Sequence, residues 1–185
     1  LRPMSDAPIR TVIDSDGGPL AFQDYFVRRR TEPRVNALRY EGATRAPPVA
    51  ALASLLTDPD LAAIFIAPSN PYLSIDPILA IPSLSAALRS STATVIAVSP
   101  IVGGQALKGP TAKIMSDLGV PVTAGAIAHH YQDLLDGFIL DDSDRGEADA
   151  LISSGLAVGA TRTVMTTLED RIHLAEFALG LAAPR

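Results

Sequence analysis

Three short segments of the sequence contain residues that could bind a ligand. In each of them, polar side chains, glycines or prolines follow directly after an apolar run. The first segment, 67–77, contains four residues that turn the chain or offer hydroxyl and amide groups: Ser69, Asn70, Pro71 and Ser74. Asp76 followed by Pro77 is typical of a helix N-cap and first helical position, and the free N–H groups of such an N-terminus suit a phosphate or the polar edge of a base. The same residue types also simply turn and cap a chain, so both interpretations stay open.

The second segment begins at Ser99 and contains the adjacent glycines Gly103 and Gly104, followed by Lys108. Paired glycines let a backbone approach a ligand closely, and Lys108 supplies a positive charge, so this segment is typical of a diphosphate cradle. It matches neither the Walker A loop, which needs Ser or Thr directly after the lysine, nor the G-x-G-x-x-G fingerprint, which leaves a nicotinamide dehydrogenase unsupported. The alternative is a glycine loop that serves packing alone.

The third segment places Thr161, Arg162 and Thr163 after the last expected strand. A guanidinium pairs with phosphate through two hydrogen bonds, although a surface salt bridge is the simpler explanation for one arginine. The acidic run 141–144 either holds Mg²⁺ through one or two carboxylates or forms a solvated turn that caps the next helix.

Two adjacent histidines lie within an expected helix. His129 and His130 point about 100° apart there, so they do not form the i, i+4 pair of a two-histidine metal site. A structural or surface role is the simpler interpretation, and a role lining a crevice as an acid, base or stacking group is the alternative.

Composition limits the classes of partner. Among 185 residues, 15 Lys and Arg stand against 20 Asp and Glu, a net charge of −5, so the chain lacks the basic field that holds nucleic acid or an anionic membrane. The absence of cysteine excludes disulfides, thiolate nucleophiles and zinc–thiolate sites. No apolar run reaches the ~18 residues of a membrane span and no signal-peptide hydrophobic region opens the chain, so we expect a cytoplasmic protein without a membrane partner.

Strands and helices alternate from residue 62 onwards, which predicts an α/β fold with a mostly parallel sheet and helices on both faces. The run 62–67 is typical of a buried parallel strand. Strands are expected over 62–67, 93–98, 137–140 and 156–160, and helices over 49–56, 76–88 with a break at Pro82, 110–118, 124–135, 147–153 and 168–181. In such sheets ligands bind beyond the carboxyl ends of the strands, where the three segments lie.

The first 45 residues have a different pattern. Gly17 and Gly18 predict a hairpin, because glycine readily adopts positive φ. The elements expected here are strands over 9–13, around Leu20 and over 35–40, and a short helix over 21–30. We expect a hairpin-containing lobe over 1–45 and an α/β nucleotide-binding body over 46–185, both within one larger domain.

Several ordered blocks resemble the 2-phospho-L-lactate transferase family of deazaflavin coenzyme F-420 biosynthesis. The blocks are 3–6, 22–27, 68–71 with 74–79, and 99–104 with 108–110, together with Ala128, Tyr131 and 163–165. The blocks occur in the same order as in the family, and together they extend over the whole sequence. The resemblance implies a Rossmann-like core.

The resemblance also implies a reaction. Members of the family move a phospholactyl group, or a phosphoenolpyruvyl group in related forms, from a guanosine-diphosphate-linked donor to a ribityl hydroxyl of a deazaflavin acceptor, releasing GMP with Mg²⁺ as cofactor. The protein then mainly positions the reactants and neutralises charge on the diphosphate. The implied nucleotide contacts are Ser69, Asn70, Pro71, Ser74, Ser99, Gly103, Gly104 and Thr163, and the implied catalytic residues are Asp6 and Lys108, with no metal ligand assigned.

Family members are longer and begin with a Gly-Gly-Thr-Gly-Gly turn and acidic residues that help to hold the metal and the deazaflavin. This sequence starts at Leu1 without them, so we expect a carboxyl-terminal portion that acts with a missing amino-terminal part. A homodimer is expected, with Phe22, Tyr25 and Phe26 serving either that contact or the core. Two alternatives stay open: a nucleotide or nucleotide-sugar binding module of the same fold, and an inactive fragment.

Overall fold

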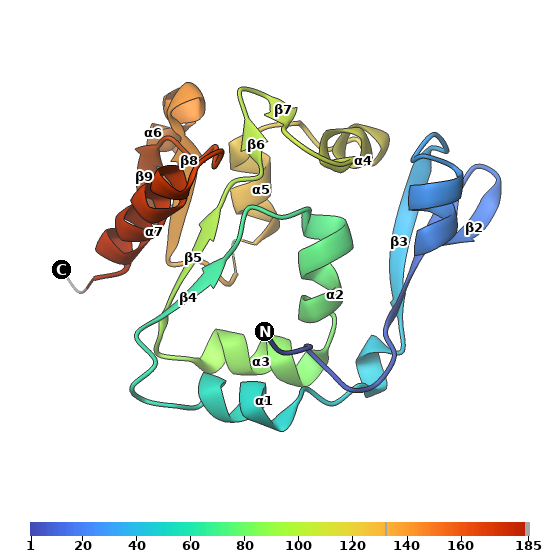
Figure 1. Ribbon diagram of the computed structural model, residues 1–185, viewed down its shortest axis with the longest axis horizontal. Coiled ribbons are helices and arrows are strands. Elements are labelled where there is room, and N and C mark those ends of the chain that lie inside the picture. The colour runs from blue at the N-terminus through green and yellow to red at the C-terminus, as the bar shows by residue number, and fades with distance from the viewer. Residues whose placement is uncertain (132, 184–185) are drawn as a thin grey trace. The chain divides into compact units, whose positions relative to one another are not determined.

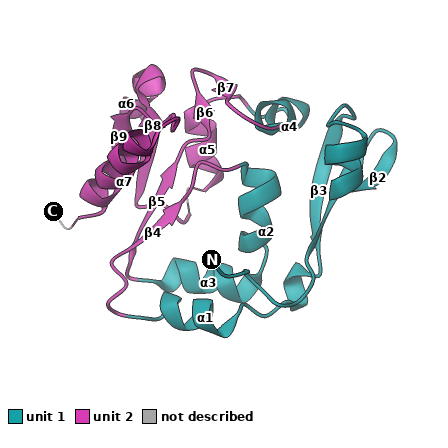
Figure 2. Ribbon diagram, in the orientation of Figure 1, with its two compact units in different colours: residues 1–58, 70–91, 110–120 teal, residues 59–69, 92–109, 121–185 magenta. Residues whose placement is uncertain are grey.

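The computed structural model describes residues 1–131 and 133–183, and its helices and strands are labelled in Figure 1. These residues group into two compact units, which Figure 2 colours separately. Unit 1 comprises Leu1–Asp58, Asn70–Ser91 and Pro110–Val120, and unit 2 comprises Pro59–Ser69, Thr92–Gly109 and Pro121–Arg185. The predicted lobe over 1–45 lies wholly in unit 1, whereas 46–185 contributes to both units, and the predicted domain boundary stays a prediction.

Unit 1 contains a three-stranded antiparallel sheet in the order β2-β1-β3. Its strands are β1 (Arg10–Ser15), β2 (Gly18–Ala21) and β3 (Val35–Glu41). The predicted hairpin is confirmed, and Gly18 adopts a φ of 95°, a left-handed value that suits glycine. Ile13 pairs with Leu20 on one side and Leu38 on the other and is fully buried, so the register places this apolar residue of β1 in the core.

The helices of unit 1 are short. They are α1 (Ala50–Leu56), α2 (Asp76–Leu79), α3 (Pro82–Ser90) and α4 (Thr111–Asp117), with π-helical turns over Asp24–Arg28 and Pro71–Ile75 and a 3-10 turn over Ala43–Arg45. The predicted break at Pro82 is confirmed, because this proline begins α3 after a bend of 85°. Within the described ranges no single helix meets the length and hydropathy needed to cross a membrane, and the bent pair 71–79 and 82–90 meets them only when joined.

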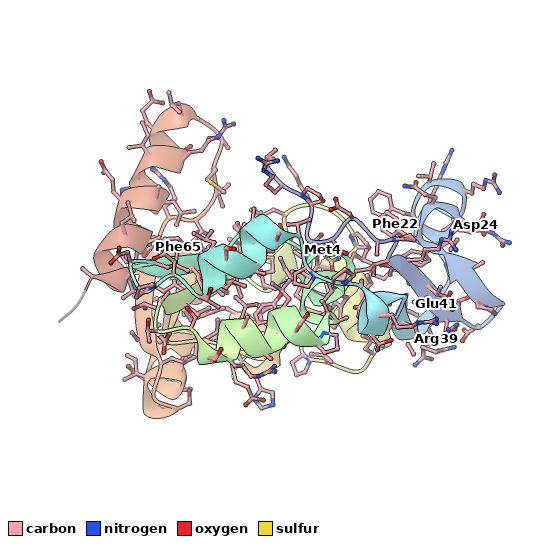
Figure 3. All side chains as sticks on the ribbon, turned by 90° about the horizontal axis from the view of Figure 1, so that it is seen from below. Met4, Phe22, Asp24, Arg39, Glu41 and Phe65 are labelled. Carbon is pink, nitrogen blue, oxygen red and sulfur yellow. The ribbon has the colours of Figure 1, made fainter. Side chains whose placement is uncertain are left out.

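The segment predicted as a helix over 21–30 is centred on the π-helical turn Asp24–Arg28. Phe22, which precedes this turn, stacks on Phe26 with 5.4 Å between ring centroids, and Figure 3 labels both Phe22 and Asp24. Tyr25 is fully buried, while Phe26 is 41% exposed. Of the three aromatic residues, Tyr25 therefore serves the core of unit 1.

Unit 2 is built on a four-stranded parallel sheet flanked by helices, which confirms the predicted α/β fold. In spatial order its strands are β4 (Ala63–Ile66), β5 (Thr94–Val98), β8 (Gly137–Asp141) and β9 (Ala157–Thr161). A small hairpin pairs β6 (Ile101–Val102) with β7 (Gln105–Ala106), a 3-10 turn covers Asp142–Glu147, and the helices are α5 (Ala124–His130), α6 (Ala148–Ser153) and α7 (Leu168–Ala182).

Two details of unit 2 differ from the prediction. Helix α5 ends at His130 with Tyr131 as its C-cap, so it is shorter than the expected 124–135, a range whose residue 132 lies outside the described residues. The run 62–67 forms a strand but not a buried one, because β4 stands at the edge of the sheet and Phe65 is 42% exposed.

Helix α7 packs on the sheet through a cluster of apolar side chains: Ile96, Val98, Ile139, Leu174 and Ala178. Gly159 on β9 makes room for it. A Cβ at Gly159 would lie 2.5 Å from Cε1 of Phe177. Strand β9 can therefore pack closely against α7 because this position lacks a side chain.

Candidate functional site

The carboxyl ends of the four parallel strands meet at one edge of the unit 2 sheet. Ile66 of β4 is in register with Ala97 of β5, and Asp141 of β8 with Thr161 of β9. Two of the predicted segments therefore follow neighbouring strands at the same edge, one at Ser69 and one at Ser99. Polar groups at this edge are placed where open α/β sheets bind ligands.

Gly103 and Gly104 form the two-residue turn of the β6–β7 hairpin, in which Val102 pairs with Gln105. Their φ angles of 58° and 72° are both left-handed, as a type I′ hairpin turn requires. The N–H of Gly103 donates to Oδ2 of Asp144 at 2.9 Å. The glycines thus have a structural task that the sequence analysis did not identify, and the Gly103 amide is already engaged by a buried carboxylate.

The hydroxyls of Ser99 and Thr163 are both satisfied within unit 2. Ser99 Oγ donates to the carbonyl of Ile101 at 2.9 Å and accepts from the Ile101 N–H at 3.1 Å. Thr163 donates its N–H and its Oγ1–H to Oδ2 of Asp141, at 2.8 Å and 3.0 Å. Both residues are buried, so each orders a strand exit, and their predicted nucleotide contacts stay predictions.

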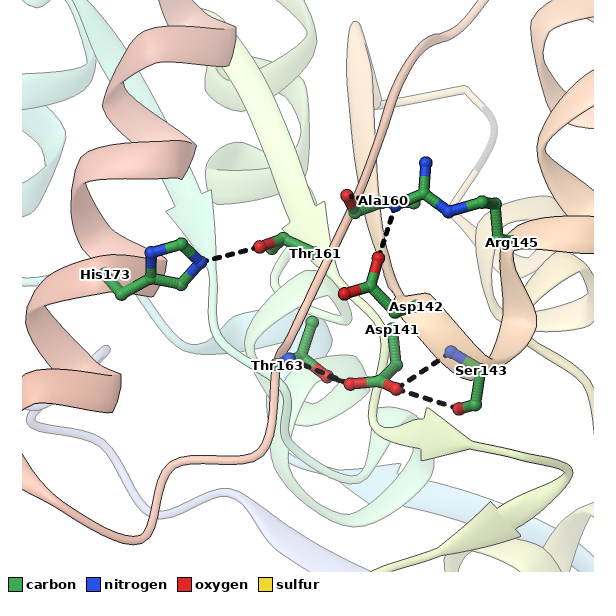
Figure 4. A network of polar contacts seen from close by, with 8 residues as sticks. All are labelled: Asp141, Asp142, Ser143, Arg145, Ala160, Thr161, Thr163 and His173. Atoms are coloured by element: carbon green, nitrogen blue, oxygen red, sulfur yellow. Dashed lines mark hydrogen bonds and ion pairs between the residues drawn. The ribbon is translucent and has the colours of Figure 1, made fainter.

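Asp141 is the centre of the polar network drawn in Figure 4. Its Oδ1 accepts from the N–H and the hydroxyl of Ser143, at 3.1 Å and 2.8 Å, while Oδ2 accepts from Thr163. Burial alone raises the pKa of this carboxyl, but the four hydrogen bonds outweigh it and hold the pKa below its usual value. Asp141 is therefore an ionised anchor for two strand exits.

The acidic run 141–144 supports a capping turn. Asp141 is the N-cap of the 3-10 turn, Asp144 anchors Gly103, and Asp142 forms an ion pair with Arg145 at 2.5 Å. Among residues 1–131 and 133–183, no group of three or more His, Asp or Glu side chains is arranged to hold a metal ion. The described residues thus do not supply a ready Mg²⁺ site.

Lys108 is the exposed cation of the second segment, and it forms no ion pair within the described part of the chain. Gly104 is exposed beside the turn, and Ser69 is half-buried with its N–H donating to the Ala67 carbonyl at 2.7 Å. Together with the exposed Gly103, whose amide already bonds Asp144, these three residues are the predicted contacts of unit 2 that are not buried.

The other predicted residues belong to unit 1, because the boundary between the units falls between Ser69 and Asn70. Asn70 Oδ1 accepts from the N–H of Leu73 at 3.0 Å, which caps the turn that begins at the buried Pro71. Helix α2 itself begins at Asp76 with Ile75 as its N-cap, so Pro77 lies in the first turn as predicted, whereas Asp76 is the first helical residue rather than the predicted N-cap. Ser74 is exposed.

The side-chain amide nitrogen of Asn70 is buried and has no hydrogen-bond partner among the described residues. A buried donor without an acceptor is uncommon, because it loses its hydrogen bonds to water. Asp6 is exposed, in the segment that precedes β1. The sequence analysis therefore selected one residue, Asn70, with an unsatisfied polar atom.

Tyr40 is a polar residue of unit 1 that the sequence analysis missed. Its hydroxyl donates to the Tyr72 carbonyl at 2.6 Å and lies 3.3 Å from Oδ2 of Asp76. Burial, and then the neighbouring Asp76 carboxylate, raise the pKa of Tyr40 far above its usual value. Only the fold brings β3 to this turn, so the sequence held no local signal for the contact.

Arg162, His173 and His130 each have a neighbour of their own, and His130 packs edge-on against Tyr131 with 4.9 Å between ring centroids. Arg162 pairs with Asp170 at 2.9 Å, which favours the salt-bridge interpretation of this arginine. His173 bonds Thr161 Oγ1 at 2.8 Å (Figure 4). His129 is exposed and lines a hollow of about 390 Å³ between α5 and α6.

Comparison with known proteins places this chain in a family. Residues 1–155 match the sequence model of the family described as "2-phospho-L-lactate transferase CofD". The chain belongs to the 2-phospho-L-lactate transferase family. This confirms the resemblance found from the motif blocks.

Relatives of the family carry two different names. The chain is similar to a 2-phospho-L-lactate transferase of Methanococcoides burtonii, with 36% identity over 98% of this chain and 58% of the relative. It is also similar to a phosphoenolpyruvate transferase of Kitasatospora aureofaciens, with 35% identity over 98% of this chain and 58% of the relative. The chain thus spans less than two thirds of the length of these family members.

A crystal structure of a Bacillus halodurans protein has the same fold. It superimposes with a TM-score of 0.60 at 15% sequence identity, over 96% of this chain and 60% of that one. At this identity the likeness concerns the fold alone.

Proposed function

We propose that this chain forms the carboxyl-terminal part of a transferase that moves a phospholactyl or phosphoenolpyruvyl group from a guanosine-diphosphate-linked donor to a deazaflavin. The observation that carries the proposal is the family match over residues 1–155. Because relatives of nearly equal identity are named for phospholactate and for phosphoenolpyruvate, the proposal includes both acids. The proposal includes a homodimer in the cytoplasm.

In the proposed reaction, a ribityl hydroxyl oxygen of the deazaflavin bonds to the phosphorus that carries the acid. The bond from this phosphorus to the bridging oxygen breaks, and GMP leaves with that oxygen, while the hydroxyl proton passes to solvent. No covalent enzyme intermediate is needed. The protein contributes by orienting the two substrates and by stabilising negative charge on the diphosphate.

The chain's own residues would divide this work. The exposed Lys108 and Gly104 would face the diphosphate, because a lysine that forms no ion pair with the described residues is available to a phosphate. A phosphate at Gly103 would have to replace the Asp144 carboxylate at that amide.

Mg²⁺ is part of the proposed reaction but fits the described residues poorly. Asp141 is saturated by four hydrogen bonds, and the described acidic residues form no three-ligand group. Magnesium in phosphoryl-transfer sites is commonly held by substrate phosphates and one or two carboxylates. We therefore place its protein ligands outside these residues and assign it no step here.

A reconstituted assay tests the proposal. The chain is co-expressed with the portion of the Methanococcoides burtonii relative that has no counterpart in it. The complex is then supplied with deazaflavin, Mg²⁺ and one of two guanylated donors, which carry phospholactate or phosphoenolpyruvate. Formation of GMP together with phosphorylated deazaflavin is the expected result. Binding of GDP without turnover would instead favour a nucleotide-binding module, and the absence of both would contradict the proposal.

A further inference from the structure

Strand β4 leaves one edge of the unit 2 sheet open. It pairs with β5 and with no other strand of the described residues (Figure 1). Thr94 N donates to the Ala62 carbonyl at 3.2 Å, and successive residues of a strand direct their backbone groups to opposite sides. The N–H and C=O groups of Ile64 therefore face β5, and those of Ala63 and Phe65 face the open edge.

Strand β4 is short, with four residues, but it lacks three other features that usually protect an edge strand: charged residues, proline and a bulge. Parallel sheets are normally covered on both faces, which is why their strands are apolar throughout. An apolar parallel strand with an open edge is therefore incomplete by itself.

The face of β4 beside α7 is also uncovered. Phe65 is in register with Ile96, and neighbouring residues in register point to the same face of a sheet. Ile96 is fully buried in the cluster under α7, but Phe65 is 42% exposed, and Figure 3 shows it on β4. Helix α7 packs on β5, β8 and β9, and it contacts β4 less than it contacts these three strands.

A hollow lies on the same face, between the start of β4 and the end of α7. Its volume is about 310 Å³, and its lining includes Ala63, Thr94, Leu179 and Ala182. Leu179 is 60% exposed. Because Ala63 and Phe65 are two residues apart on one strand, the hollow and the exposed Phe65 ring lie along one face.

We propose that the β4 surface, defined as Ala63, Phe65 and Leu179, docks a β-strand and its adjoining helix from polypeptide outside residues 1–185. The strand pairs in parallel with the open backbone groups of Ala63 and Phe65. The helix lies beside α7, where it fills the hollow and covers the Phe65 ring. Parallel strands are joined through crossover helices, so a strand that extends this sheet brings such a helix with it.

The length of the relatives identifies the occupant. The Methanococcoides burtonii relative matches 98% of this chain, but the match covers only 58% of the relative, so more than a third of that protein has no counterpart here. This portion is long enough for several strand-and-helix units. A second copy is the weaker candidate, because β4 pairing with itself about a twofold axis would run antiparallel in a sheet that is otherwise parallel.

Hydrogen exchange and co-purification test the proposal without nucleotide, deazaflavin or metal, so its outcome is separate from that of the transferase assay. The unmatched portion of the Methanococcoides burtonii relative is co-expressed with the chain so that both fold together. We expect the two to purify as a complex in which the amides of Ala63 and Phe65 exchange slowly. In the chain alone these amides should exchange fast at every concentration.

Paired variants locate the contact. We expect Phe65→Lys and Leu179→Lys each to weaken the complex about tenfold or more, since both put a charge in an apolar contact. Ile152→Lys is the matched control, because Ile152 is 53% exposed in the same unit but on α6, and it should change affinity less than about twofold. Circular dichroism of each variant chain shows whether it is folded.

Four results would overturn the proposal. The first is that the two polypeptides do not co-purify, and the second is that they do but the Ala63 and Phe65 amides still exchange fast. The third is that Ile152→Lys weakens the complex as much as Phe65→Lys and Leu179→Lys do. The fourth is that these amides exchange slowly in the chain alone. Protection that rises with the concentration of the chain alone would assign β4 to a second copy. Slow exchange of the Ala63 and Phe65 amides in the chain alone at every concentration would show that the edge of β4 is not open.

Discussion

Asp141 and Thr163 join the exits of two neighbouring strands through one carboxylate oxygen. Oδ2 of Asp141, at the end of β8, accepts the N–H of Thr163 at 2.8 Å and its hydroxyl at 3.0 Å, just beyond the end of β9. Oδ1 of the same carboxylate holds Ser143. The carboxyl edge proposed to bind the nucleotide is thus shaped by a buried anion as well as by apolar packing.

We expect Asp141→Asn to lower the free energy of unfolding by about 1–3 kcal/mol, because the amide accepts fewer and weaker hydrogen bonds than the carboxylate. Urea unfolding followed by circular dichroism measures the change. Asp142→Asn is the control, because Asp142 is exposed and its one partner among the described residues is Arg145, and the change should cost under about 1 kcal/mol. Equal losses in the two variants would contradict the anchoring role of Asp141.

The same pair predicts a pH dependence. Because the folded-state pKa of Asp141 lies below its usual 3.8, its ionisation stabilises the fold above that pH, and the contribution is lost as the pH falls through the folded-state pKa. The stability difference between the wild-type chain and Asp141→Asn should therefore be full at pH 7 and shrink below about pH 4. A difference that stays constant or grows on acidification would refute the assignment.

Much of unit 2 could be predicted from the sequence, because its signals are local. The apolar runs around Ile96 and Ile139, separated by helical stretches, indicated a parallel α/β sheet. In unit 1, Pro82 marked the break between two helices. The paired glycines at 17 and 18 identified the hairpin of unit 1. The motif blocks also identified the family.

The remaining features depend on contacts between residues distant in the sequence. The bond from Gly103 to Asp144 spans 41 positions, so the run 141–144 could be interpreted as a metal site or a turn, and Gly103 as a phosphate contact. Ser99 was selected for its position at a strand end, whereas its hydroxyl is used by Ile101. Likewise, the exposure of Phe65 depends on sheet order, which the apolar run does not encode.

We expect Gly159→Ala to destabilise unit 2 by about 1–3 kcal/mol, because its Cβ would stand 2.5 Å from Cε1 of the Phe177 ring. Combining it with Phe177→Leu should recover part of this loss, as two residues in contact do when they are coupled. Gly146→Ala is the control, since a Cβ there meets nothing within 4 Å and should change stability within about 0.5 kcal/mol. Thermal unfolding of these three variants and of Phe177→Leu alone measures this, and additive losses would contradict the packing account.

We expect Lys108→Ala to weaken GDP binding about tenfold in the chain co-expressed with the unmatched portion of its relative, because a charge-assisted bond to phosphate is lost. Isothermal titration calorimetry measures the affinity. Arg171→Ala removes one exposed positive charge on α7 and serves as the matched control, with little expected change. Unchanged affinity in Lys108→Ala would remove this residue from the proposed site.

The binding of GDP to the carboxyl edge of the sheet can be observed residue by residue. Amide chemical shifts of the co-expressed complex are recorded by nuclear magnetic resonance while GDP is added. Our account predicts that the largest changes fall on Ser69, Gly103, Gly104 and Lys108, the residues that follow β4 and β5. Changes confined to the hollow between α5 and α6, around Gly125 and Ser154, or no change at all, would contradict it.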